Sequence, residues 1–252
     1  MGTLLLAILS FVTLSGCLAT SSAPILDTPT PPPATVTLTP TIVWFPPTAT
    51  PTIIPTPVMT PTVDIRPQVG ELIFQDQFTS PSGWNLAIAN NSSVALGKNE
   101  ISLAISQPKL YLYTLRKDKV FDNFYLEITA SPNLCLGDDE YGVLFRVTPA
   151  LDFYRLALTC NGQIHLDRVL QGKASSPIPK KFSGAVPPGA PSSSLIAIWA
   201  SGKEILVYVN QEFQFSISDS SLQAGSIGLF ARSAGENALS ISFSNLMIYK
   251  VK

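Results

Sequence analysis

The chain has 252 residues, of which 16 are Lys or Arg and 17 are Asp or Glu, and its formal net charge is −1. The sequence contains no basic patch of the kind that nucleic acid binding requires, which excludes nucleic acid as an expected partner. Hydrophobic residues make up 46% of the chain, and the part after residue 67 is long enough for one domain with a sizeable core.

The N-terminus begins with a short apolar run, Leu4–Leu9 followed by Phe11 and Val12. This run is far shorter than the roughly 20 apolar residues of a membrane-spanning helix. It has the length of a signal-peptide core. We therefore predict that residues 1–16 are a signal peptide and that the chain is exported.

Leu14-Ser15-Gly16-Cys17 comes directly after this run. It resembles the lipobox of bacterial lipoproteins, in which a branched apolar residue and two small residues precede a cysteine. The resemblance implies cleavage before Cys17, attachment of lipid (palmitate included) to that cysteine, and anchoring at the extracytoplasmic face of the cell membrane. Two or three acyl chains anchor stably, because each buried methylene contributes about 0.8 kcal/mol. Met1-Gly2-Thr3 lacks the usual Lys or Arg, and an ordinary secretory signal is the alternative.

Residues 17–67 have the composition of a linker. Between Pro24 and Pro67 the chain holds 13 of its 22 prolines, together with 12 threonines. Proline fixes φ and biases the preceding residue to extended conformations, which excludes helix and central strand. We predict a disordered, semi-rigid spacer of polyproline II character that lifts a domain away from the membrane.

Residues 68–252 are predicted to form one all-β domain. Short segments rich in Val, Ile, Phe, Tyr and Thr recur between turn-forming residues, and Asn161-Gly162 and Asn210-Gln211 mark tight hairpins. In 141–148 the odd-numbered residues are predicted to share one face and Arg146 to lie on the other. The pattern indicates a two-sheet antiparallel sandwich of jelly-roll type. The predicted strands are 71–78, 100–105, 110–115, 121–130, 141–148, 153–159, 163–171, 194–200, 204–209, 212–218, 225–231 and 238–251.

Six motifs in this domain follow one another in a familiar order and spacing. They are Tyr141–Arg146, Phe153–Leu156, Asn161–Ile164, Ile205–Asn210, Gly225–Phe230 and Ile241–Ile248. Together they resemble the concanavalin A-like (laminin-G/lectin-type) β-sandwiches, and within them the subset described as 3-keto-disaccharide hydrolase-like. The resemblance covers residues 71–252 and implies the fold. It does not select an activity, because this fold hosts lectins, enzymes and adhesion modules alike.

The remaining cysteines and a run of carboxylates suggest two further features. With Cys17 assigned to lipid, Cys135 and Cys160 are an even pair in an exported chain, which predicts a disulfide bond. Asp138-Asp139-Glu140 is interpreted either as a turn or as a calcium site, because clustered carboxylates suit hard cations. Calcium is the only cofactor that the sequence suggests.

The sheet face opposite the core carries residue types suited to sugar recognition, which uses an aromatic platform and planar hydrogen-bonding groups. An ordinary solvated sheet face is the alternative, as is a structural role for the single histidine, which can pair with Asp167 along its strand. The candidate ligand-binding residues are Arg146, Phe153, Arg155, His165, Asp167 and Trp199.

Two functions remain open, and a purely structural sandwich displayed on the spacer is a third possibility. The favoured one is a lipid-anchored, surface-displayed, non-catalytic module that binds carbohydrate or a cell-surface protein. The other is a glycoside-processing enzyme of the 3-keto-disaccharide hydrolase type. Glycosidic hydrolysis needs a pair of spaced carboxylates, and the Glu-x-Asp-x-x-Glu motif of the fold's glucanases is missing. No catalytic residue is therefore assigned.

Overall fold

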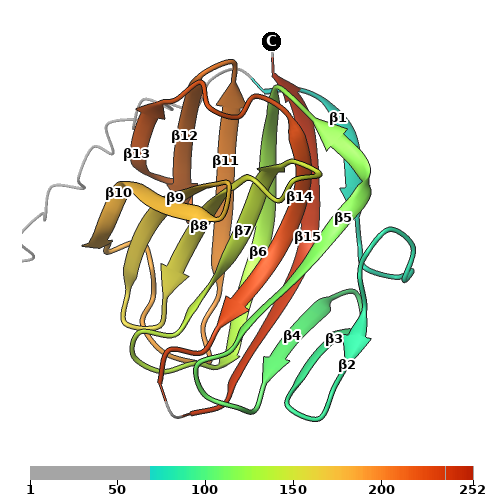
Figure 1. Cartoon of the computed structure of the whole chain (residues 1–252), viewed down its shortest axis with the longest axis vertical. Coiled ribbons are helices and arrows are strands. Elements are labelled where there is room, and N and C mark those ends of the chain that lie inside the picture. The colour runs from blue at the N-terminus through green and yellow to red at the C-terminus, as the bar shows by residue number, and fades with distance from the viewer. Residues whose placement is uncertain (1–68, 236, 252) are drawn as a thin grey trace, which may run out of the picture. The chain divides into compact units, whose positions relative to one another are not determined.

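The computed structural model describes residues 69–235 and 237–251, which belong to the unit Thr60–Lys252 of the chain. These residues form strands, turns and loops (Figure 1), so the all-β prediction is confirmed. In this described part no helix is long and apolar enough to cross a membrane. The predicted signal peptide, the lipidation site Cys17 and the linker 17–67 lie outside the described residues.

One sheet has nine strands and is antiparallel throughout. Its strands are β1 (Val69–Asp76), β2 (Ala87–Ile88), β3 (Ser92–Leu96), β4 (Ile101–Ile105), β6 (Phe124–Leu134), β11 (Ser194–Ser201), β12 (Glu204–Val209), β13 (Glu212–Ser218) and β15 (Leu239–Val251). Their order is β13-β12-β11-β6-β15-β4-β3-β2, and β1 pairs with β15. The long strand β15 therefore holds three neighbours, β1, β4 and β6.

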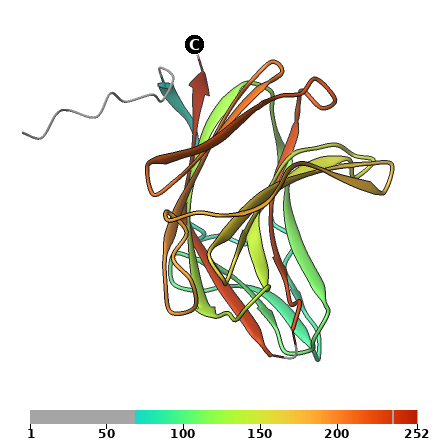
Figure 2. The ribbon, with the colours of Figure 1, turned by 90° about the vertical axis from the view of Figure 1, so that its left-hand side faces the viewer.

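The second sheet has six strands and carries the candidate site. Its strands are β5 (Tyr111–Phe121), β7 (Glu140–Val147), β8 (Phe153–Thr159), β9 (Gln163–Leu170), β10 (Lys173–Phe182) and β14 (Gly225–Arg232). They are ordered β10-β9-β8-β7-β14-β5, with every pair antiparallel. Figure 2 shows the two sheets as two facing layers, as predicted for a sandwich.

The core lies between the two layers and is built from alternate residues of the strands. Tyr141, Val143 and Phe145 of β7 are fully buried in it, as their spacing predicts. Phe145 stacks on Tyr154 of β8 with ring centroids 5.2 Å apart, and it meets Phe124 of β6 edge-on at 6.4 Å. These aromatic contacts join strands of both sheets, so the core fixes which face of the six-stranded sheet points outward.

Every predicted strand overlaps an observed one, and β8, β12 and β13 have the predicted bounds. The sequence analysis missed β2, β3 and β10. The strand β10 contains Pro177 and Pro179, which cannot donate to a ladder. The two prolines are tolerated because β10 is the outermost strand of its sheet and because its pairing with β9 is irregular.

Both predicted hairpins are confirmed. Gly162 joins β8 to β9 with φ of 85°, and Asn210 and Gln211 join β12 to β13 with φ of 50° and 68°. Two successive left-handed residues match the twist of a two-residue antiparallel hairpin. Asn210 tolerates this conformation because its side chain is tied down, with Oδ1 accepting from Leu195 N at 2.8 Å and Nδ2 donating to Ala185 O at 2.8 Å.

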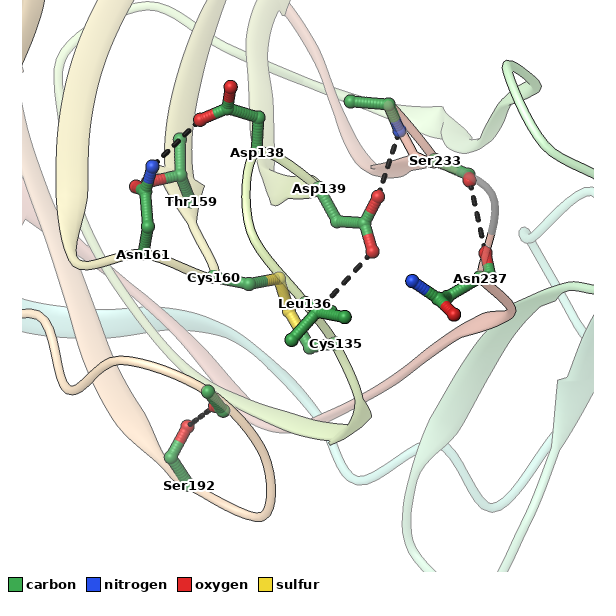
Figure 3. The surroundings of a disulfide bond; sticks show 12 residues. Cys135, Leu136, Asp138, Asp139, Thr159, Cys160, Asn161, Ser192, Ser233 and Asn237 are labelled. Carbon is green, nitrogen blue, oxygen red and sulfur yellow. Dashed lines mark hydrogen bonds between the residues drawn. A yellow bond between two sulfur atoms is a disulfide. The ribbon is translucent and has the colours of Figure 1, made fainter.

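The predicted disulfide is also confirmed (Figure 3). Cys135 and Cys160 are bonded, and their Cα atoms lie 5.6 Å apart. Cys135 directly follows β6 of the nine-stranded sheet, whereas Cys160 directly follows β8 of the six-stranded sheet. The bond therefore ties the two layers together at one end of the sandwich.

Replacing Cys135 and Cys160 together by Ala is expected to lower the free energy of unfolding. The bond closes a loop with a sequence separation of 25 residues, for which chain entropy predicts a loss of about 3–3.5 kcal/mol. Urea unfolding of the two proteins, both carrying Cys17→Ser so that no other thiol reacts, measures the difference. Equal midpoints for the two proteins would contradict a stabilising role.

Candidate functional site

The face of the six-stranded sheet that turns away from the core carries two groups of side chains. They adjoin one another because Arg155 of β8 pairs in register with Asp167 of β9 on one side and with Leu144 of β7 on the other. We define the charged cluster as Glu140, Arg155, His165, Asp167, Lys180 and Arg232. We define the aromatic cluster as Tyr111, Tyr113, Phe153 and Phe230, together with Leu115, Leu144 and Val147.

An ion pair between Arg155 and Asp167 forms one side of the charged cluster. Arg155 Nη2 lies 2.5 Å from Asp167 Oδ2, and Ser176 of β10 donates to the other carboxylate oxygen at 2.6 Å. Burial by itself would raise the pKa of the Asp167 carboxyl. Contacts with His165, Ser176 and Arg155 outweigh that effect and hold this pKa well below its ordinary value. Both partners of the pair are therefore charged and held in place.

Glu140 is the centre of the charged cluster. Its side chain is only 1% exposed, and it is paired with two cations. Lys180 Nζ lies 2.6 Å from Oε1 and Arg232 Nη1 lies 3.1 Å from Oε2. His165 Nε2 is 3.4 Å from Oε1. Burial alone would raise the pKa of the Glu140 carboxyl, but contacts with His165 and Lys180 lower it to about 2. Glu140 is thus a buried anion with cationic groups from β10 and β14 around it.

His165 lies between the two carboxylates. Its Nδ1 is 3.4 Å from Asp167 Oδ2, opposite the contact of Nε2 with Glu140. Burial lowers the pKa of this imidazole, but the two carboxylates outweigh burial and raise it above its ordinary value. Since Glu140 and Asp167 both stay ionised near neutral pH, neither is suited to act as the general acid that glycoside hydrolysis requires.

The aromatic cluster packs against the charged one through Arg155. Tyr111 of β5 stacks on Phe230 of β14 with ring centroids 5.6 Å apart, and the Tyr113 ring lies 5.9 Å from that of Tyr111. The guanidinium carbon of Arg155 lies 5.7 Å from the Tyr111 ring and 5.8 Å from the Phe230 ring. Cation–π attraction therefore holds Arg155 from the side opposite Asp167.

Two adjacent cavities open beside the aromatic cluster. The smaller has a volume of about 160 Å³, and Tyr111, Phe153 and Leu144 are among its lining residues. The larger has a volume of about 690 Å³ and is lined partly by Lys117, Asn85 and other residues around β5. Both are lined by Tyr113, Leu115, Val147 and Leu151. The larger volume lies within the range typical of small-molecule sites.

The prediction that Arg146 lies on the outer face of the sheet was wrong. Phe153, Arg155, His165 and Asp167 do share the outer face, but Arg146 is fully buried and donates from Nη1 to Leu222 O at 2.8 Å. A β-bulge is the cause: Arg146 has φ of 51°, and the pairing of β7 with β14 shifts at this point. The extra residue turns Arg146 away from the face and turns Val147 onto it.

The prediction that Trp199 joins the other candidates on one sheet face was also wrong. Trp199 lies on β11 of the nine-stranded sheet, where it packs against the group that includes Ala197 and Tyr249. Its strand belongs to the opposite layer of the sandwich. Trp199 therefore cannot contribute to a site on the six-stranded sheet.

Of the two interpretations of Asp138-Asp139-Glu140, the structure shows the turn, at residues 137–138, and does not bring the three carboxylates together (Figure 3). Asp138 accepts from Asn161 Nδ2 at 2.7 Å, whereas Asp139 accepts from the backbone amides of Leu136 at 3.2 Å and Ala234 at 2.8 Å. Glu140 points to the outer sheet face instead. Asp138 lies in the turn before β7 and Glu140 is the first residue of that strand, so the side chains diverge. Residues 69–235 and 237–251 contain no group of three or more His, Cys, Asp or Glu side chains placed to hold a metal ion.

Several residues of the site were missed by the sequence analysis. Lys180 lies on the unpredicted strand β10, and Arg232 is one residue beyond the predicted strand 225–231. Tyr111 and Phe230 lie in the predicted strands 110–115 and 225–231. Alternation of inward and outward side chains, applied to these two strands as well, would have identified both residues as candidates. Nothing in the sequence indicates that Glu140 forms ion pairs with Lys180 of β10 and Arg232 of β14.

The stability of the protein is expected to fall in acid because of Glu140. Its pKa is lower in the folded protein than the ordinary 4.5, so its stabilisation is present above pH 4.5 and is lost as pH falls towards about 2. The loss is on the order of 3 kcal/mol. Urea unfolding from pH 7 to pH 2 measures it. Glu140→Gln should remove this part of the pH dependence.

Glu212→Gln is the matched control, because it removes an exposed carboxylate from β13 of the other sheet. Its unfolding profile should follow that of the unchanged protein. If the Glu140→Gln profile runs parallel to the unchanged protein at every pH, the buried anion does not stabilise the fold.

Comparison with known proteins supports the architecture. No protein-family model matches the chain, and no curated protein sequence matches it. Among solved structures, the carbohydrate-binding module CBM66 from Bacillus subtilis is similar, with 14% identity over 67% of this chain and 96% of that one and a TM-score of 0.51. A Bacillus subtilis protein of unknown function with a galectin-like fold has 11% identity over 73% and 99%, with a TM-score of 0.58.

An enzyme is similar to the same degree. Bacillus licheniformis β-glucanase has 14% identity over 73% of this chain and all of its own, with a TM-score of 0.54. A fold shared by binding modules and a glucanase does not by itself assign an activity. The described residues have the jelly-roll sandwich fold that occurs in carbohydrate-binding modules and glucanases.

Proposed function

We propose that this chain is a carbohydrate-binding module and that its binding surface is the outer face of the six-stranded sheet. The observation that carries the proposal is the fixed position of Arg155. Its guanidinium is held by Asp167 on one side and by the Tyr111 and Phe230 rings on the other. A planar donor group is thus presented at the border of an aromatic surface.

Sugar recognition uses both parts of this face. The apolar side of a sugar ring can pack on an aromatic ring, while its hydroxyls need donors and acceptors with fixed directions. Tyr113 is 43% exposed and lines both cavities. Preorganised groups favour binding because little conformational entropy is lost when the ligand arrives. The similarity in fold to a carbohydrate-binding module agrees with this proposal.

The competing candidate is a glycoside-processing enzyme of the 3-keto-disaccharide hydrolase type. It has less support, because the two carboxylates on this face have lowered pKa values and are both tied to cations. A general acid for glycoside cleavage needs a raised pKa. Binding without turnover is therefore the function that the described residues support best.

We further propose that Cys17 carries lipid and holds the module at the outer side of the membrane. The support is the Leu14-Ser15-Gly16-Cys17 motif after an apolar run, and the Thr/Pro-rich segment that follows it. A disulfide between Cys135 and Cys160 agrees with an oxidising compartment.

Tyr113→Ala is expected to weaken glycan binding by roughly five- to thirtyfold. An aromatic ring that packs against a sugar contributes about 1–2 kcal/mol to binding through ring packing and apolar burial. Glycan-array screening of the purified full chain identifies the ligand, and isothermal titration with that glycan measures the loss.

Phe213→Ala is the matched control, because Phe213 is also 43% exposed but lies on β13 of the nine-stranded sheet. It should bind as tightly as the unchanged protein. Loss of binding in Phe213→Ala with full binding in Tyr113→Ala would place the site on the other sheet. Turnover of a chromogenic glycoside by the unchanged protein would favour the enzyme instead.

For the anchor, globomycin treatment of expressing bacteria is expected to accumulate an uncleaved precursor, because it blocks the lipoprotein peptidase. In a separate experiment, the Cys17→Ser chain should carry no lipid, whether it is released from the membrane fraction or remains uncleaved. Incorporation of labelled palmitate measures the modification. A Cys17→Ser protein that still incorporates palmitate would overturn the assignment.

A further inference from the structure

The charged cluster on the outer face of the six-stranded sheet has more cations than anions. Arg155, Lys180 and Arg232 contribute three positive charges, whereas the carboxylates of the cluster, Glu140 and Asp167, contribute two negative ones. His165 adds positive charge whenever it is protonated, which its raised pKa favours. This surplus occurs on a chain whose formal net charge is −1.

The charges also differ in depth. The side chains of Lys180 and Arg232 are 39% and 45% exposed, while that of Glu140 is 1% exposed beneath them. The Asp167 side chain is 7% exposed. A ligand approaching this face therefore meets the ammonium and the guanidinium first, and the carboxylates are already covered by their partners.

Glu140 brings the two exposed cations to one place. Lys180 Nζ contacts one carboxylate oxygen and Arg232 Nη1 contacts the other, so two cations from different strands converge on a single buried anion. The guanidinium and the ammonium have donor N–H groups beyond those that Glu140 can accept. Asp138, the exposed carboxylate nearest in sequence, is turned to Asn161 instead.

We propose that the ligand of this surface is an anionic glycan, whose carboxylate or sulfate group binds between Lys180 and Arg232 while a neighbouring sugar ring reaches Arg155 and the aromatic cluster. This inference rests on the proposed function and narrows its ligand class. Arginine pairs with carboxylate and sulfate oxygens through parallel N–H groups, and such charge-assisted hydrogen bonds are stronger than neutral ones.

The test uses the purified full chain and two matched pairs of polysaccharides. Polygalacturonate is compared with its methyl ester, which has the same backbone without the carboxylate charge. Dextran sulfate is compared with dextran, which has the same backbone without the sulfate charge, so that the two pairs separate carboxylate from sulfate recognition. We expect at least one acidic member to bind roughly tenfold or more tightly than its neutral partner, with an affinity that falls as salt is raised.

Variants locate the anion site. Arg232→Gln and Lys180→Gln should each weaken binding of the preferred acidic glycan by roughly tenfold. Arg232→Lys should recover only part of the loss, because it retains the charge but lacks the parallel N–H groups. Lys203→Gln is the control, since it removes an exposed lysine between β11 and β12 of the other sheet. Thermal unfolding confirms that each variant is folded.

The outcomes separate this inference from the proposed function. If neutral and acidic glycans bind equally through this face, the anionic ligand is wrong while the carbohydrate-binding function stands. If Lys203→Gln loses as much affinity as Arg232→Gln, the attraction is general electrostatics and the proposed site is wrong. If no polysaccharide on the array or in these pairs binds, both proposals fail.

Discussion

Glu140 places an ionised carboxylate on a sheet face with almost no exposure to water. An uncompensated buried charge costs several kcal/mol, and removing one partner of such a group is strongly destabilising. The arrangement therefore needs Lys180 from β10, His165 from β9 and Arg232 from β14 to be in place together. One side chain on β7 thus fixes the positions of charged groups on both sides of it in the sheet.

The same arrangement determines what the face offers to a ligand. The carboxylates of Glu140 and Asp167 are buried and paired with cations of the cluster. The groups that remain at the surface are therefore cationic and aromatic. Arg155 connects the two parts, since it is paired with Asp167 and also packs against Tyr111 and Phe230. A surface in which donors and rings are already held in position suits binding of a polar, ring-shaped ligand more than it suits proton transfer.

The sequence predicts the fold well and the site in part, for reasons that can be traced to single residues. Alternation correctly puts Arg155 and His165 on one face because β8 and β9 pair without a register shift. It fails at Arg146, where a bulge adds one residue to the strand. It cannot tell which sheet Trp199 joins, because alternation assigns a face of a strand and not a layer. Lys180 is missed because prolines hide an edge strand.

The outer face of the six-stranded sheet is the surface that we propose for glycan binding. Backbone amide NMR of isotope-labelled protein, titrated with the glycan that binds most tightly, tests this claim without any substitution. We expect the perturbed amides to cluster on β7, β8, β9 and β14, around Arg155 and Glu140. Perturbations that cluster instead on β6, β11, β12 and β15 would place the ligand on the opposite sheet and contradict the proposed binding surface.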